Sequence, residues 1–311
     1  MPRGSIRKLA TLTPFLASRL PRWRVVPRSA PPLGRLGDLE VRLAASAAEV
    51  RQAQALRYRI FYEEMNAIAD FRTRHSRRDA DRFDRHCDHL LVIDHAPARR
   101  SRFGLPSIVG TYRLLRQEVA EAIGGFYSAG EFDLVPFLER SPHLRVLELG
   151  RSCVLAEYRN KRTLELLWHG VWTYVLRHDC DVMIGCASLE GVDPEKQAMP
   201  LSFLHHHHRA PEEWRVTARA DRRVEMNRMD LEAIEPKAAL RSLPPLIKGY
   251  LRLGAFVGEG AVVDRQFRTI DVAIVLPVAG IAARYVDYYG ADAGRHAVSA
   301  QRSEDAPLVA A

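Results

Sequence analysis

Hydrophobic and polar residues alternate along this chain in short runs that predict strands. Residues 39–43, Leu-Glu-Val-Arg-Leu, have the period of two that is typical of a half-buried strand. Short apolar runs predict further strands at residues 90–93, 108–115, 144–155, 182–185 and 272–276. We expect the strands at 90–93 and 108–115 to be neighbours, because only turn residues separate them.

Helical periodicity alternates with these strands. Ser46 and Glu49 form a capping box, which predicts a helix that continues to about Met65. From Thr163 onward, apolar residues recur at intervals of three and four, as in a helix packed on a sheet. Similar patterns predict an Arg- and Asp-rich loop at residues 72–85 and helices at residues 245–253 and 281–288. The strand, helix and strand over residues 144–185 imply a right-handed crossover, so we predict one α+β domain with a mixed sheet.

Composition sets the domain boundaries and excludes two classes of protein. The chain has 311 residues, and its 47% apolar content is too high for a disordered protein. Its longest apolar run, residues 272–283, is far shorter than the ~18 residues of a membrane-spanning helix. Residues 1–37 are expected to be a basic, Pro-rich tail, residues 38–290 the folded domain and residues 291–311 a flexible tail.

The charge balance favours anionic partners. The net charge is +8, mostly from arginine, which suits phosphate groups, an acidic protein or a membrane surface. Four cysteines without C-x-x-C spacing predict neither a zinc site nor a disulfide framework and suit a reducing cytosol. The four histidines at residues 205–208 have no spaced cysteine or carboxylate partner, so we predict no metal site.

Candidate chemistry is concentrated in residues 146–163, where a strand runs through a basic loop into a helix start. Free N–H groups and the positive end of the helix dipole make such a loop an anion site. Glu148 within an apolar strand needs a partner or a function, because unpaired burial of a charge is costly. Gly150 would tolerate a bulge, which would re-orient Arg151 and leave backbone donors unpaired beside Glu148. A buried structural ion pair is the alternative.

This arrangement of strand, bulge, basic loop and helix resembles motif A of the GNAT acyltransferases. Further stretches resemble acyl-homoserine-lactone synthases, at residues 57–64 (Arg-Tyr-Arg-Ile-Phe-Tyr-Glu-Glu), 81–84, 110–114 and Glu148-x-x-Arg151. A closer resemblance, to the ornithine-lipid acyltransferases, lies in residues 158–163, 166–170 and 245–254. The resemblance covers about residues 38–290 and implies the GNAT fold, a mixed central sheet flanked by helices.

The family resemblance implies an activity. A 3-hydroxyacyl group would pass from acyl-carrier protein to the α-amine of ornithine, giving lyso-ornithine lipid. No cofactor is expected beyond the phosphopantetheine arm of the carrier. Arg162 and Leu164 occupy the first and last glycine positions of the usual GNAT pyrophosphate loop, which favours carrier protein over CoA as donor.

The same resemblance assigns roles to individual residues. Glu148, directly or through a water, would remove the proton from the amine. The backbone N–H groups near Ser152, Cys153 and Val154 would stabilise the oxyanion. The residues expected to orient the base or bind substrate are Arg151, Arg57, Phe61, Asp81, Asp84 and Arg113. Those expected to bind phosphopantetheine or the carrier are Arg159, Asn160, Lys161, Arg162 and Thr163. Each charged residue has a plain alternative as a structural ion pair.

Localisation follows from the implied product. Transfer of an acyl tail of about 16 carbons into water would cost more than ~10 kcal/mol, at ~0.8 kcal/mol per methylene, so release of the product into a bilayer is easier. We therefore expect a peripheral protein on an anionic membrane surface, at the cytoplasmic face of the bacterial membrane.

Two other functions stay open at this point. An acyl-homoserine-lactone synthase would share the donor and the Glu148/Arg151 pair, although the Gly-Trp of those enzymes is replaced by Met65-Asn66. A basic nucleic-acid-binding protein would also explain the charge, but the arginines are spread over the chain and show no aromatic–basic interleaving, so we expect no nucleic-acid partner.

Overall fold

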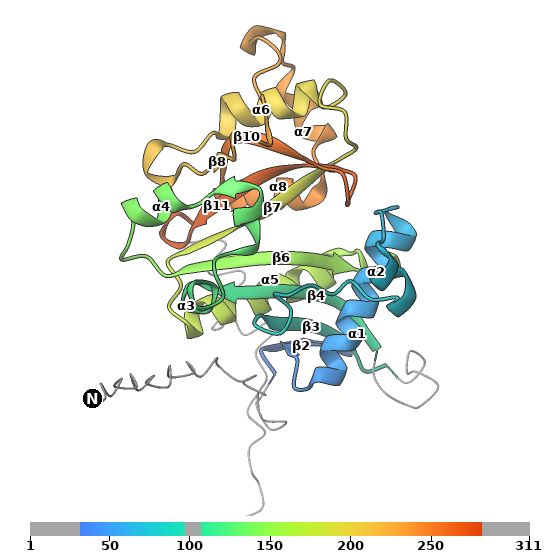
Figure 1. Ribbon diagram of the computed structural model, residues 1–311. Coiled ribbons are helices and arrows are strands. Elements are labelled where there is room, and N and C mark those ends of the chain that lie inside the picture. Colours follow the sequence, from blue (N-terminus) through green and yellow to red (C-terminus); the bar gives the residue numbers. More distant parts are fainter. Residues whose placement is uncertain (1–31, 97–106, 282–311) are drawn as a thin grey trace, which may run out of the picture.

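The protein was analysed as a computed structural model, which describes residues 32–96 and 107–281. One mixed sheet dominates it, in the order β1-β2-β3-β4-β6-β7-β11-β10-β8-β5, and β9 pairs with β10 beside that path (Figure 1). The strands are β1 (Gly34–Leu36), β2 (Leu39–Leu43), β3 (Asp88–Asp94), β4 (Ser107–Arg116), β5 (Phe132–Asp133), β6 (Val146–Val154), β7 (Val182–Glu190), β8 (Thr217–Ala218), β9 (Arg223–Val224), β10 (Phe256–Asp264) and β11 (Thr269–Pro277). Paired strands are antiparallel except β6 with β7 and β10 with β8.

Helices cover both faces of this sheet. The α-helices are α1 (Ala47–Tyr58), α2 (Phe71–Ser76), α3 (Gln117–Ala122), α4 (Val135–Arg140), α5 (Lys161–Arg177), α6 (Ala198–His208), α7 (Pro236–Ser242) and α8 (Pro245–Leu253). The π-helix η1 (Arg59–Glu64) continues α1, and short 3-10 turns form η3 (Tyr127–Gly130), η4 (Ala156–Tyr158), η5 (Glu212–Trp214), η6 (Leu231–Ala233) and η7 (Val278–Gly280). Helix α1 lies in front of β3 and β4 in Figure 1, and α5 lies behind them. Among the described residues, none of the helices combines the length and the apolar character needed to cross a membrane.

The sheet opens between β6 and β7. These parallel strands pair only over Val146–Glu148 and Val182–Ile184, after which β6 stays with β4 and β7 stays with β11. At the branch point the strands are in close contact, because a Cβ on Gly185 would lie 2.4 Å from the Leu149 carbonyl oxygen. The two half-sheets beyond this point therefore leave a space between their backbones.

Helix α5 is held close to the sheet by a glycine. A Cβ at Gly170 would lie 2.6 Å from Cγ2 of Val41, and both methyl groups of Leu90 would be 3.2 Å away. The helix begins at Asn160, whose side chain accepts a hydrogen bond from Thr163 N–H, as expected for an N-cap. The close packing at Gly170 and the cap at Asn160 together give the start of α5 a defined position beside the opening.

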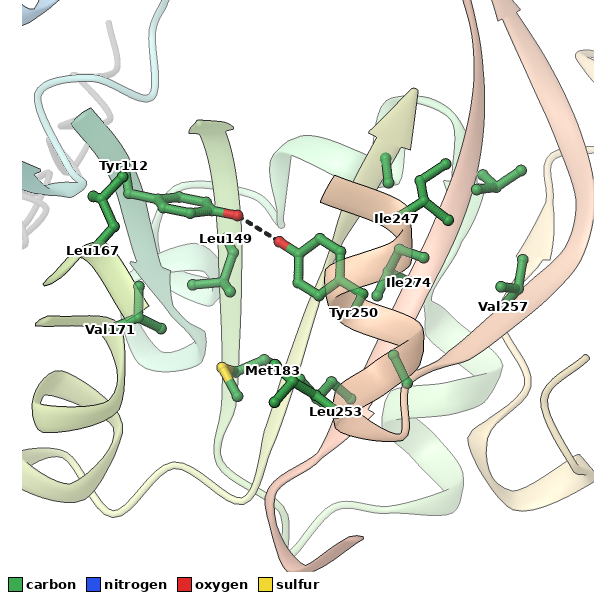
Figure 2. Close-up of a cluster of buried hydrophobic side chains, with 14 of the residues drawn as sticks. Tyr112, Leu149, Leu167, Val171, Met183, Ile247, Tyr250, Leu253, Val257 and Ile274 are labelled. Carbon is green, nitrogen blue, oxygen red and sulfur yellow. Dashed lines mark hydrogen bonds between the residues drawn. The ribbon is translucent and has the colours of Figure 1, made fainter. Parts of the chain in front are cut away.

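The larger hydrophobic core extends from α5 across the opening to α8. Figure 2 shows Leu167 and Val171 of α5 on one side, and Tyr250 and Leu253 of α8 on the other. Leu149 and Met183, from the two strands that separate, lie between them (Figure 2). The base of the opening is thus apolar and closely packed.

Most predicted elements are confirmed, including the α+β class and the mixed sheet. The parallel β6–α5–β7 unit is present, and α8 has the predicted bounds. Two predictions need correction. The predicted loop contains α2, because the Asp70 side chain accepts a hydrogen bond from Thr73 N–H and caps a helical turn. The expected tail also ends too late: β1 pairs with β2, so the sheet begins before residue 38. The helix expected at residues 281–288 lies almost wholly outside the described residues.

Candidate active site

A cavity of about 1580 Å³ lies where β6 and β7 separate. Its walls come from β4, β6 and β7, from η1 and α8, from the start of α5, and from β11 and the turn that precedes it. Elements far apart in the sequence thus enclose one space, which is larger than most small-molecule sites. Glu148, Arg151, Phe61 and Arg113 are among the predicted site residues that line it.

The predicted bulge in β6 is present. Gly150 pairs with Arg113 and Cys153 with Thr111, so that two residues of β6, Arg151 and Ser152, lie opposite a single residue of β4. The left-handed residue of this bulge is Arg151, with φ of 53°, rather than Gly150. A non-glycine residue in this region is strained unless its surroundings hold it. The contacts of the Arg151 side chain supply that support.

Glu148 lines the cavity, and its carboxylate is held by a turn. Its Oε2 accepts a hydrogen bond from Tyr127 N–H at 2.8 Å, and Oε1 accepts from Ser128 N–H at 2.7 Å and Ser128 Oγ at 2.5 Å. Burial raises the pKa of Glu148, while these three donors act in the opposite direction. The alternative of an ion pair between Glu148 and Arg151 is wrong, because Arg151 has other carboxylate partners.

Three arginines predicted to contact substrate form a buried network with aspartates. Arg57 is fully buried and pairs with Asp79 at 2.8 Å and with Asp84 at 2.7 Å. Neither Arg57 nor Asp84 is among the described residues that line the cavity. The prediction that these two contact substrate is therefore corrected: Arg57 neutralises Asp79 and Asp84 and fixes the loop before β3 against α1.

Arg113 and Arg151 extend this network to the cavity wall. Arg113 pairs with Asp81 at 2.7 Å, and Arg151 pairs with Asp79 at 3.2 Å. The Arg151 guanidinium also lies over the Tyr127 ring, 4.7 Å from its centroid. Asp81 is engaged by Arg113 and does not line the cavity within the described part of the chain, which argues against its predicted contact with an ammonium group. By contrast, Nη2 of Arg113 is buried and has no hydrogen-bond partner among the described residues.

The predicted phosphate loop divides into two groups. Arg159, Asn160 and Lys161 line the cavity, so the N-terminus of α5 faces it. Thr163 is buried against the Asn160 cap instead. The guanidinium of Arg162 lies at the β1–β2 turn, 3.1 Å from where a Cβ on Gly37 would be. The prediction that Thr163 and Arg162 bind the donor directly is therefore corrected, because neither side chain lines the cavity among the described residues.

The backbone donors of β6 differ in direction. Leu155 N–H donates to Val109 O of β4 at 2.9 Å. Because successive residues of an antiparallel strand face opposite sides, the N–H of Cys153 also faces β4 and that of Val154 faces the cavity. Ser152 lies in the bulge, where the alternation is broken. Of the three predicted oxyanion donors, Val154 is the one that regular strand geometry turns toward the cavity.

Sequence reasoning missed three features of the site. Tyr112 and Tyr250 join β4 to α8 through their hydroxyl groups, 2.5 Å apart (Figure 2). Asp79 lies just outside the recognised 81–84 stretch, and no local pattern marks it. Carboxylate oxygens of Glu131 and Asp271 gather with one of Asp264, although these residues share no motif.

The splayed sheet, the bulged strand and the helix N-terminus facing one cavity define an acyltransferase of the GNAT class. In agreement with this geometry, the family model described as an acetyltransferase (GNAT) domain matches residues 56–169.

Comparison with known proteins identifies the family within that class. The chain is 58% identical over 263 residues to the L-ornithine N(alpha)-acyltransferase of Rhizobium meliloti (strain 1021), a match covering 85% of this chain and 88% of that protein. It is 55% identical to the protein of the same name from Brucella abortus (strain 2308), covering 85% and 92% of the two chains. This protein belongs to the L-ornithine N(alpha)-acyltransferase family.

Solved structures are more distant. The chain is similar to FeeM, an N-acyl amino acid synthase from uncultured soil microbes, at 12% identity and a TM-score of 0.44, covering 78% of this chain and 91% of that one.

Proposed function

We propose that this protein transfers a 3-hydroxyacyl group from acyl-carrier protein to the α-amine of ornithine, which gives lyso-ornithine lipid. The observation that carries the proposal is the single cavity in which buried Glu148 and the N-terminus of α5 both lie. Family membership supports ornithine as the acceptor over the lactone-synthase alternative, because the relatives are named for ornithine.

The proposed reaction begins at Glu148. Its Oε2 accepts one hydrogen bond, so a lone pair is left for a proton from the acceptor ammonium, taken directly or through a water. The free amine attacks the thioester carbon and the carbonyl becomes an oxyanion, toward which Val154 N–H is directed. Collapse of the intermediate breaks the C–S bond. The proton held by Glu148 then passes to the leaving thiolate, which regenerates the carboxylate. The attacking nitrogen still carries one proton too many and releases it to water, so the products are a neutral amide and a free thiol.

Arg113 is suited to hold the α-carboxylate of the acceptor. Its Nη1 pairs with Asp81, but the buried Nη2 has no partner in the described part of the chain, and the residue lines the cavity. A buried donor without an acceptor is costly, and a substrate carboxylate would remove that cost. An arginine also matches the planar geometry of a carboxylate.

The donor arm is proposed to enter at the start of α5. Backbone N–H groups and the helix dipole favour a phosphate there, and the exposed Lys161 ammonium, 3.5 Å from the Glu165 carboxylate, adds a cation that a phosphate can share. Arg162 lies away from the cavity and Leu164 lines its rim, so the loop lacks the glycines for close approach to a pyrophosphate. A single phosphate, as in a carrier-linked phosphopantetheine, is the better fit.

Exposed apolar residues at and near the cavity support docking of the protein on a membrane. Met65 and Leu164 are exposed and line the cavity, and Ile68 and Phe71, which follow Met65 in the chain, are 60% and 82% exposed. An apolar rim on a protein of net charge +8 suits an anionic membrane, into which the product would leave.

The test is a reconstituted reaction with identified products. Purified protein and 3-hydroxyacyl-carrier protein are incubated separately with ornithine, lysine, glutamine and S-adenosylmethionine, and products are identified by mass. We expect acylated ornithine to predominate, and the matching 3-hydroxyacyl-CoA to be a poorer donor. Turnover with S-adenosylmethionine but not with ornithine would instead indicate a lactone synthase.

A further inference from the structure

Three carboxylates form a cluster on the wall of the cavity. Glu131 follows η3, Asp264 ends β10 and Asp271 lies on β11. One carboxylate oxygen from each lies within 4.8 Å of the others. Asp264 and Asp271 line the large cavity, while Glu131 and Asp264 line a neighbouring cavity of about 780 Å³. The acidic cluster, Glu131, Asp264 and Asp271, therefore lies where these two spaces meet.

The cluster is short of positive charge. Glu131 has Arg222 at 3.4 Å, and Asp264 accepts hydrogen bonds from the backbone of its own turn, Gln266 N–H and Phe267 N–H. Burial and the neighbouring aspartates raise the pKa of Glu131 to about 7. The charge of Arg151 also reaches Asp271 and lowers its pKa. Two arginines thus face three acidic side chains, and the remaining negative charge favours an additional cation.

Asp271 gives an independent indication of a ligand at this place. It is 6% exposed, and its Oδ1 is buried without a hydrogen bond of regular geometry in residues 32–96 and 107–281. The donors beside its carboxylate are the neutral hydroxyl groups of Ser188 and Thr269, which lower the pKa of Asp271, but burial outweighs them and raises it. A buried carboxylate whose nearby hydrogen-bond donors are all neutral is costly, which favours a charged donor.

We propose that the acidic cluster binds the side-chain ammonium of the acceptor amino acid and so selects a basic acceptor. This inference rests on the proposed function and names the residues behind its specificity. An ammonium group carries three donors and one positive charge, which matches three converging carboxylates.

The position of Cys186 connects this cluster to Glu148. Its Sγ lies 3.6 Å from Oε2 of Glu131, and the charges of Glu131, Asp271 and Glu148 all raise its pKa. Glu131, Asp271 and Glu148 therefore all lie near one side chain of β7, Cys186. In the proposed arrangement the α-amine of the acceptor lies at Glu148 and its side-chain ammonium at the acidic cluster; the two nitrogens of extended ornithine are ~6 Å apart from ordinary bond lengths.

Asp271→Asn tests this assignment, because it removes one charge and keeps the side-chain shape. The measured quantity is kcat/KM for ornithine and for norvaline, which has the same carbon skeleton without the terminal amine. We expect kcat/KM for ornithine to fall about 100-fold, the loss of a charge-assisted contact, and that for norvaline to stay within about 3-fold. Asp221→Asn, a change at an exposed carboxylate outside the cluster, is the matched control and should change neither.

The outcomes separate this inference from the proposed function. If the unmodified protein acylates neither amino acid, the proposed function fails. If it acylates ornithine and Asp271→Asn leaves the ratio of ornithine to norvaline unchanged, the cluster assignment alone is overturned. Should Asp271→Asn fail to fold by circular dichroism, Asp264→Asn at a less buried position carries the same expectation.

A divalent metal is the competing occupant, because three carboxylates can also bind a hard cation. Treatment with EDTA followed by dialysis should leave ornithine turnover unchanged if the cluster binds the ammonium. Loss of turnover that added Mg²⁺ or Mn²⁺ restores would overturn the proposal in favour of a metal.

Discussion

Replacing Glu148 with glutamine tests the proposed base while keeping the size of the side chain. Three donors point at the carboxylate, two at Oε1 and one at Oε2. A glutamine oxygen placed at Oε1 would keep the two bonds from Ser128. Its NH₂ group would then face Tyr127 N–H at the former Oε2, so one hydrogen bond to a charged acceptor would be lost.

The expected size of the effect follows from these contacts. A hydrogen bond to a charged group contributes about 1.5–3 kcal/mol, partly offset here because the neutral amide is cheaper to bury. We expect the free energy of unfolding in urea to fall by about 1–2 kcal/mol. Loss of a general base should reduce acyl transfer about 10²–10⁴-fold at neutral pH.

Ser128→Ala is the matched control for Glu148→Gln. It keeps the carboxylate and the Ser128 backbone donor but removes the Ser128 hydroxyl. In the unmodified protein the hydrogen bond from this hydroxyl lowers the pKa of Glu148. Without that hydroxyl the pKa rises further, and a base must be ionised to act. The acid limb of kcat/KM against pH should therefore move to higher pH, with the plateau at alkaline pH retained.

Two results would refute this reasoning. Glu148→Gln with more than about one tenth of the normal turnover would assign Glu148 to supporting the turn alone. An acid limb that does not move in Ser128→Ala would show that the rate depends on the ionisation of another group.

Three further predictions concern stability, each measured by urea unfolding. The pKa of Glu131 is raised to about 7, so between about pH 4.5 and 7 the folded state holds a proton that the unfolded state releases, and stability falls as pH rises through this window. Glu131→Gln should therefore add about 2 kcal/mol to the free energy of unfolding at pH 8 and change it little at pH 5. Gly170→Ala should destabilise by about 1–2 kcal/mol despite better helix propensity, because its Cβ would lie 2.6 Å from buried Val41, and an unchanged midpoint would show that the helix can shift freely. Arg57→Met should cost about 3–5 kcal/mol because two buried aspartates each lose one arginine partner, with Asp79 keeping Arg151 and Asp84 keeping Arg113; equal stability would mean that the ion pairs of Arg57 only offset their own desolvation.

The sequence predicts elements best where periodicity and punctuation agree. Helix α8 has its predicted bounds because Pro245 opens it and Gly254 ends it with φ of 94°. Strand β10 was missed for the opposite reason. Gly258 and Gly260 are typical of turns, but Gly258 is needed here because a Cβ would lie 2.6 Å from Val216 O of the neighbouring chain segment. Close approach between strands cannot be seen from one segment alone.

The candidate site shows the same division. The motif in β6 gave Glu148, Arg151 and the bulge, because these depend on consecutive residues. The partners of Glu148 lie twenty residues earlier in a 3-10 turn without any motif, and Asp79 lies beside a recognised stretch rather than within it. The acidic cluster comes from three separate elements that only the folded sheet brings together. Long-range pairing of charges is therefore the part of the site that local patterns leave out.

The separation of β6 from β7 creates unpaired strand edges, which in general promote aggregation. A strand with open hydrogen-bonding groups invites the strand of another molecule and promotes aggregation. Here the open flanks of both strands face each other inside the molecule, with η1, α5 and α8 around them. A narrow, flexible substrate can enter the cavity and reach these backbone groups. The surrounding helices leave too little room for a strand of a second polypeptide. The protein thus keeps unpaired backbone groups on β6 and β7 available without exposing them to aggregation by strand pairing.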